Sequence, residues 1–280
     1  MRFRVSSLVL GLFALIIFAM AGCGDDETST NSNLGSLSDP EFQAVQEQVE
    51  SFVDSTLEFV GNGMNTLQGI STGDGTIIPA QYAVDPDGDD VVSVTYEQGW
   101  HVIYIAKHFT NYATSLRDSV QFIQNGNAQQ SPTDCDSLVF VHRWDYDVVD
   151  TVSSHNILNG YSDYRFSGLD GGQATINGAN DLAIHNKVVY NDSTVWRDLT
   201  IDAEVTNLTI DYSAYAGWGQ CPVSGSVSAT VDMTYQNGTN DPVNTEWTFT
   251  GNFTNGVMAV TATCNSVTWK YSKQICNVPQ

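Results

Sequence analysis

The segment from Val195 to Tyr271 constrains the fold more than any other part of the chain. Apolar and polar residues alternate along it, most clearly from Val223 to Tyr235, where serine, threonine and aspartate fill the intervening positions. Strict alternation predicts antiparallel strands with one face on a core and the other in water. We therefore expect four or five long strands in succession here, within a large antiparallel sheet.

The residues before this segment extend the pattern. About eleven strands are predicted, and a last one at Val267–Ile275 makes about twelve. Asn-Gly dipeptides, which favour the type I′ turns of hairpins, begin at positions 125, 159, 177, 237 and 255. This spacing predicts an up-and-down meander, and because twisted sheets of this size rarely stay flat, we expect a barrel or half-barrel. The other predicted strands are Val91–Tyr96, Trp100–Tyr112, Ser115–Gln124, Ser137–Val149, Ser154–Phe166, Gln173–Asn177, Leu182–Tyr190, Val195–Asp211, Val223–Gln236, Thr245–Thr254 and Val257–Cys264.

One amphipathic helix is predicted ahead of the strands. The residues from Ser38 to Pro40 suit a capped first turn, and apolar residues recur at helical spacing from Phe42 to Val60. Glycines at positions 61 and 63 are expected to end the helix. Its polar face is acidic, so we expect it to pack on the sheet rather than on a membrane surface. The predicted fold class is therefore mainly β, between all-β and α+β.

The charge balance limits the partners that such a chain can bind. The sequence has 10 Lys and Arg against 32 Asp and Glu, a formal net charge of −22. This charge repels nucleic acid and anionic headgroups, so nucleic-acid binding is excluded. Hydrophobic residues make up 41% of the chain, enough for a substantial core.

The first residues predict export from the cytoplasm. Arg2 and Arg4 precede an apolar run from Leu8 to Met20, which small residues follow. A charged region, a short apolar region and small residues describe a secretory signal peptide. The run is shorter than the roughly 20 apolar residues of a spanning helix.

The end of this leader, Met20-Ala21-Gly22-Cys23, resembles the lipobox of bacterial lipoproteins. The resemblance implies that the Cys23 thiol carries lipid such as palmitate and that the leader is cut just before it. Ordinary secretion, with Cys23 inside the leader, is the alternative. The predicted organisation is a signal peptide at 1–22, a flexible acidic and polar tether at 23–37, and a single β-meander domain with its helix at 38–280.

The residue after Cys23 bears on the predicted location. In many Gram-negative bacteria an aspartate there retains a lipoprotein in the inner membrane, whereas this chain has Gly24. The resemblance therefore favours the outer membrane, on its periplasmic or surface face. The acidic run that follows also resembles surface-export signals, with a merely solvated spacer as the alternative.

Four further cysteines predict two disulfides in an oxidising compartment. Counting the predicted strands up and down the sheet places Cys135 and Cys264 at one end, and Cys221 and Cys276 at the other. We therefore predict the pairs Cys135–Cys264 and Cys221–Cys276. No C-x2-C spacing suggests zinc.

Two loops contain candidate ligand-binding residues. Asp85, Asp87 and Asp89 offer oxygen ligands to a cation such as Ca²⁺, but the spacing departs from an EF-hand and an acidic β-turn is the favoured interpretation. A later loop contains the three candidate ligand contacts, which suit stacking on sugars or apolar ligands. These are Tyr212, Tyr215 and Trp218. The alternative is that their rings close the end of the barrel.

The sequence contains no recognisable catalytic motif. Neither H-E-x-x-H nor G-x-S-x-G occurs, and His142 and Asp145 face opposite ways on one predicted strand. We expect the histidines to be partly exposed strand residues, and we predict neither an enzyme nor a cofactor site. The five histidines are His101, His108, His142, His155 and His185.

Two functions of different class fit these features. In the first, a half-barrel under the helix holds an apolar or lipid-like ligand; the order of elements resembles periplasmic lipoprotein carriers of the half-barrel type. In the second, the chain is a structural or adhesive surface lipoprotein with a packed core, whose outer face contacts partners or glycans. The expected lining of the first is Val227, Met233, Trp247, Phe249, Phe253 and Trp269.

Overall fold

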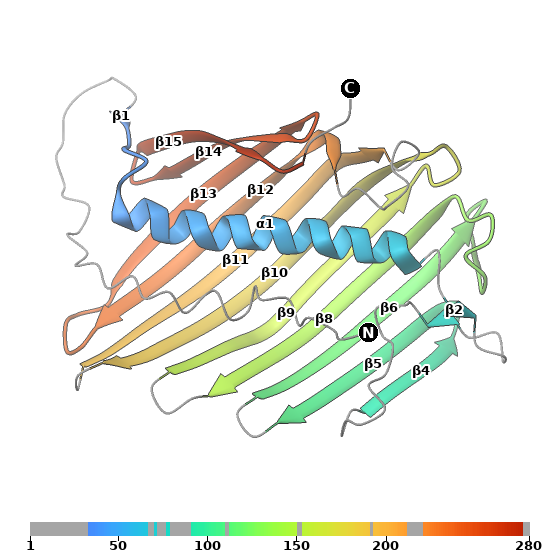
Figure 1. Ribbon diagram of the computed structural model, residues 1–280, viewed down its shortest axis with the longest axis horizontal. Helices are drawn as coiled ribbons and strands as arrows, with labels where there is room; N and C mark the ends of the chain where they lie inside the picture. Colours follow the sequence, from blue (N-terminus) through green and yellow to red (C-terminus); the bar gives the residue numbers. More distant parts are fainter. Residues whose placement is uncertain are drawn as a thin grey trace.

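The computed structural model describes residues 33–66, 70–71, 77–78, 91–109, 112–149, 153–190, 193–211 and 221–276. Within these ranges one long helix lies on one face of a large sheet (Figure 1). The helix is α1 (Pro40–Thr66), and the sheet contains β1 (Asn33–Leu34), β4 (Val91–Glu97), β5 (Trp100–Phe109), β6 (Tyr112–Gln124), β7 (Asn127–Gln129), β8 (Ser137–Val149), β9 (Ser153–Ser167), β10 (Gln173–Tyr190), β11 (Ser193–Asp211), β12 (Pro222–Asn237), β13 (Val243–Thr254), β14 (Val257–Cys264) and β15 (Val267–Gln274). A separate small sheet pairs β2 (Ile70–Ser71) with β3 (Ile77–Ile78).

The large sheet is an antiparallel meander. Strands that follow one another in sequence are neighbours from β8 to β15, and β7 forms a short hairpin at the end of β6. Among the described strands, β1 alone pairs in parallel, with β15. The predicted class, a mainly β meander with an N-terminal helix, is confirmed. The path of paired strands is open, with β1 and β4 at its edges, so the described strands do not close into a barrel.

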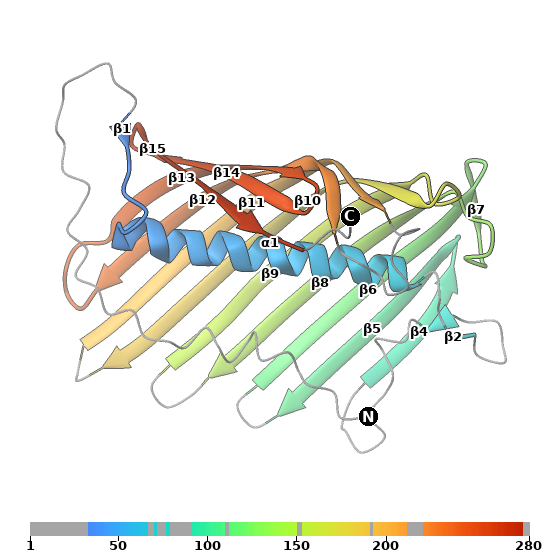
Figure 2. The ribbon, with the colours of Figure 1, turned by 45° about the horizontal axis from the view of Figure 1, so that its top comes forward.

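Helix α1 lies in the concave face of the sheet. It begins at Pro40, and the Asp39 carbonyl accepts a hydrogen bond from the Gln43 N–H at 2.9 Å, as a cap residue does. The helix crosses the strands obliquely, and β12 to β15 curl round its first half (Figure 2). It continues to Thr66, past its predicted end, because an interior glycine costs only about 1 kcal/mol relative to alanine. The buried stripe of the helix is Phe42, Val45, Val49, Phe52, Val53, Thr56 and Leu57.

An aromatic cluster fixes the first turn of α1 on the sheet. The ring of Phe42 stacks on Trp269 with 5.2 Å between centroids, and it also contacts Trp247 and Tyr271. Gly35 lies against the indole of Trp269, where an added Cβ would come within 2.1 Å of the ring. Residues 33–36, the end of the predicted tether, are thus held at the sheet edge.

Two Asn-Gly dipeptides that predict turns lie inside strands instead. Gly160 is within β9 and Gly178 is within β10, so the predicted strands 173–177 and 182–190 are one strand. A Cβ at position 160 would approach the ring of Trp144 to 2.4 Å, and one at 178 would approach the ring of Tyr164 to 2.4 Å. These glycines therefore make room for aromatic rings of the neighbouring strand.

The merged strand corrects the predicted disulfides. Four strands, not five, separate Cys135 from Cys221, so these two residues lie at the same end of the sheet. Cys264 ends β14 opposite Val267, at the far end of that strand. The predicted pair Cys135–Cys264 is therefore wrong, since its two buried thiols lie at opposite ends of the sheet.

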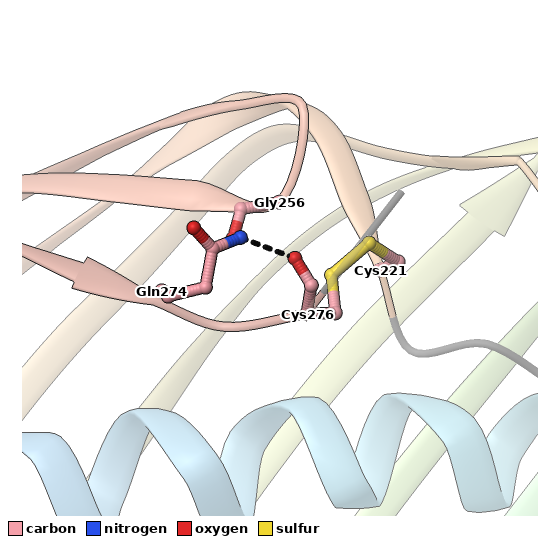
Figure 3. Close-up of a disulfide and its surroundings, with 4 residues drawn as sticks. All are labelled: Cys221, Gly256, Gln274 and Cys276. Atoms are coloured by element: carbon pink, nitrogen blue, oxygen red, sulfur yellow. Dashed lines mark hydrogen bonds between the residues drawn. A yellow bond between two sulfur atoms is a disulfide. The ribbon is translucent and has the colours of Figure 1, made fainter. Parts of the chain in front are cut away.

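The predicted disulfide Cys221–Cys276 is confirmed. Its Cα atoms are 5.6 Å apart, and it joins the start of β12 to the residues after β15 (Figure 3). The turn between β13 and β14 lies beside it. Gly256 in that turn has a φ of +79°, and its carbonyl accepts hydrogen bonds from the Ile275 N–H and the Gln274 side chain. A Cβ at this position would meet the Cys276 carbonyl at 2.6 Å, so the bridge requires glycine there.

Candidate functional site

Several residues predicted to be functional lie outside the described ranges. These are Cys23, Asp85, Asp87, Asp89, Tyr212, Tyr215 and Trp218. The lipid anchor, the candidate cation loop and the aromatic loop therefore stay predictions.

The concave face is the place predicted for an apolar ligand. All six expected lining residues are buried there, and two of them, Trp247 and Trp269, contact Phe42 of α1. The crevice left between α1 and β12–β14 has a volume of about 10 Å³, between side chains such as Phe52 and Met258. That space suits about one water molecule, because α1 fills the concavity.

A polar row interrupts the apolar concave face beneath the second half of α1. Asp118 of β6 lies opposite His142 of β8, which lies opposite Ser162 of β9, which lies opposite Asn180 of β10. All four side chains point to the helix side, between the apolar rows of the same strands. Sequence reasoning missed this row because its residues are 18 to 24 positions apart and only the register aligns them.

The pair at the start of the row is buried and hydrogen-bonded. The Nδ1 atom of His142 bonds the Oδ1 atom of Asp118, while the Oδ2 atom of Asp118 is buried without a hydrogen-bond partner among the described residues. Burial raises the pKa of the Asp118 carboxyl, against the hydrogen bond and charge of His142, which lower it. Burying this pair in an otherwise apolar face therefore costs free energy.

The far end of the row is a hydroxyl cluster around Tyr164. Burial raises the pKa of Tyr164 to about 12, against hydrogen bonds with Thr56 of α1, Asn180 and Ser162, which lower it. Although the row aligns Asp, His and Ser, Ser162 is only 3% exposed. A nucleophile must be reachable by substrate, so this arrangement suits a structural role.

The other histidines are differently placed. His101 was predicted to be partly exposed but is 2% exposed, with its Nε2 atom 2.8 Å from the Gln130 carbonyl oxygen and its ring against Phe122. His185 is partly exposed, as predicted, and its Nδ1 atom bonds Asp198 of β11 on the outer face. Among the described residues, no three His, Cys, Asp or Glu side chains are placed to hold a metal ion.

A groove with a volume of about 340 Å³ crosses β5, β6 and β8 on the outer, convex face of the sheet. Its floor is Val102, Ser119 and Val141, which are paired in register. The outward direction follows from alternation, because neighbours along each strand, such as Ile103, Val120 and Phe140, are buried. This groove is large enough to hold a small molecule.

The two walls of the groove differ in chemistry. Arg117 and Arg143, paired directly across β6 and β8, form one wall. Trp100 forms the other, together with Glu97 at the end of β4 and Gln98 in the turn that follows. The guanidinium of Arg143 lies over the ring of Tyr161, 5.3 Å from its centroid. None of these residues was singled out from the sequence, because no motif links them.

Comparisons with known proteins give no relative. No family model, no curated protein and no solved structure matches the chain. Among the described residues, no helix combines the length and apolar character needed to cross a bilayer.

Proposed function

We propose that this chain is an envelope lipoprotein, held at a membrane by lipid on Cys23, whose β domain is an adhesive or structural module that binds partners at its exposed face. The observation that carries this proposal is the filled concave face. Helix α1 buries seven side chains there, and the remaining crevice of about 10 Å³ is far below the roughly 300 Å³ of a small-molecule site. The groove of about 340 Å³ on the outer face supports binding on that side instead.

The carrier hypothesis requires that a ligand can enter the concave face, which α1 occupies. A lipid could enter the concave face only if α1 left it, and Phe42 would then leave its stacked contact with Trp269. Lys273 of β15, which bonds Asp54 at 2.9 Å and Glu50 at 3.3 Å, also holds the helix. These contacts favour a helix that stays in place.

Native mass spectrometry of the protein purified from its own host tests the proposal. We expect one species, with the mass of the chain from Cys23 onward plus the acyl groups of the anchor. A Cys23→Ser variant supplies the control, because it should lose labelled palmitate and the membrane fraction while keeping its fold. A second, non-covalent lipid released only on unfolding would favour the carrier function, and an unacylated product would refute the anchor.

A further inference from the structure

The groove on the outer face brings two cationic side chains together without an acidic partner between them. Arg117 and Arg143 occupy directly opposite positions, so their Cβ atoms are about 5 Å apart, and like charges in this relation destabilise a sheet. Within the described ranges, Arg117 makes no hydrogen bond or ion pair. An anion bound to both guanidiniums would remove this repulsion and accept paired hydrogen bonds.

The arginine wall is partly organised in advance. Arg143 lies over the ring of Tyr161, and the Tyr161 hydroxyl donates a hydrogen bond to Asp163 at 3.2 Å. A guanidinium stacked on an aromatic ring loses less freedom when it binds a ligand. On the other side, Tyr104 lies opposite Arg117. One row of four strands thus presents two arginines between two tyrosines.

The opposite wall suits a sugar ring. Trp100 and Tyr104 are four residues apart on β5, so the two walls are separated by about 13 Å. Between them lie the small side chains of the floor, including the Ser119 hydroxyl. An indole face stacks on the C–H face of a sugar, and the carboxylate and amide of Glu97 and Gln98 suit its hydroxyls.

The charge of the whole protein narrows the ligand class. A formal net charge of −22 repels densely charged polymers such as nucleic acid. Asp163 lies opposite Val141 at the end of the groove floor and opposes a second anionic group there. A ligand with a single carboxylate on an otherwise neutral framework satisfies the arginine pair without meeting this repulsion.

We propose that the groove binds an oligosaccharide bearing one uronic-acid carboxylate, with that carboxylate between Arg117 and Arg143 and a neighbouring ring on Trp100. This inference rests on the proposed function, because it names the class of partner that the exposed face would bind.

Matched sugar pairs test the inference on the full-length protein. Disaccharides ending in glucuronic, galacturonic or mannuronic acid are compared with their neutral hexose counterparts by calorimetric titration and ligand-observed NMR. We expect at least one acidic sugar to bind about tenfold or more tightly than its neutral match. Arg117→Gln, Arg143→Gln and Trp100→Ala should each weaken that binding about tenfold, while salt weakens binding of the acidic sugar only.

Arg165→Gln is the matched control, since Arg165 is an exposed arginine of β9 that does not line the groove. Equal binding of acidic and neutral sugars, no binding of any pair, or an equal loss in the Arg165 variant would each overturn the inference. Any of these results, obtained while no lipid co-purifies, would overturn the inference and leave the packed-core proposal standing. Sedimentation tests a further alternative. If the chain self-associates and Arg117→Gln prevents this, the arginine pair binds a second copy of the chain, and the inference is overturned.

Discussion

The two halves of the concave face stabilise the same helix by different chemistry. Under the first half of α1, β12 to β15 supply an aromatic and aliphatic surface in which Phe42 contacts three rings. Under the second half, β6 to β10 supply the polar row from Asp118 to Asn180, which reaches the helix through Tyr164 and Thr56. One half is mainly apolar, whereas the other includes a buried carboxylate, that of Asp118.

This difference separates stability from specificity. Burying an aromatic side chain against others contributes several kcal/mol and tolerates small displacements. A buried hydrogen-bonded pair contributes little net stability, but it penalises any register in which the partners are separated. We infer that the apolar half holds α1 on the sheet and that the polar row fixes the alignment of β6, β8, β9 and β10.

The largest expected effect lies in the apolar half. Phe42→Ala should lower the free energy of unfolding by about 3–5 kcal/mol, because it removes a fully buried ring and leaves a cavity between two tryptophans. Val243→Ala, at a site that is 48% exposed, is the control and should change stability by less than about 0.5 kcal/mol. Urea unfolding followed by tryptophan fluorescence measures both, and equal small effects would mean that α1 is not held by this cluster.

The polar row predicts a smaller loss that a second substitution restores. Asp118→Val should cost about 3 kcal/mol, because it leaves the largely buried His142 without its carboxylate. Adding His142→Leu should recover most of this loss, since an apolar pair of similar volume replaces the ionic one. If the double variant is as unstable as the single one, the pair contributes net stability and the proposed division between the halves fails.

The disulfide reinforces the apolar half alone, because it closes the 55 residues that form β12 to β15. Cys221→Ser with Cys276→Ser should lower stability by about 2–4 kcal/mol, chiefly by freeing the unfolded chain. Reductant should then have no further effect on this variant, whereas it should destabilise the wild type. Cys135→Ala is the control and should keep the wild-type response; a lost response there would show that Cys135 takes part in a bridge.

Alternation in the sequence was enough to predict the sheet, and the stripe from Phe42 was enough to predict the helix. The errors came from residues whose local signal and structural role differ. The dipeptides at Gly160 and Gly178 predict turns, yet each glycine lies within a strand and makes room for a ring on the preceding strand. One of these false turns split β10, reversed the count of strands and so misplaced Cys135.

The candidate groove could not be predicted for a related reason. Its walls come from β4, β5, β6 and β8, and Arg117 meets Arg143 only through a register that the single sequence does not specify. The polar row is hidden in the same way. Period-two patterns specify which face a side chain takes, but pairing across strands decides which side chains meet.

The smallest predicted effect concerns pH, and it arises from two buried groups outside the apolar half. Burial lowers the pKa of His101, against its hydrogen bond to the Gln130 carbonyl, which raises it. The unfolded chain therefore takes up this proton first, so stability present above about pH 6.5 is lost as the pH falls toward the folded pKa, by at most about 1.4 kcal/mol per pH unit. The raised pKa of Asp118 acts in the opposite sense, because its contribution to stability is complete below about pH 3.9 and is lost as the pH rises through the folded value.

Urea unfolding from pH 4 to 8 should accordingly show a shallower loss of stability on the acid side for His101→Gln and a steeper one for the Asp118→Val, His142→Leu variant. Phe42→Ala should shift the whole curve down without changing its shape, and a change of shape there would show that the halves are not independent.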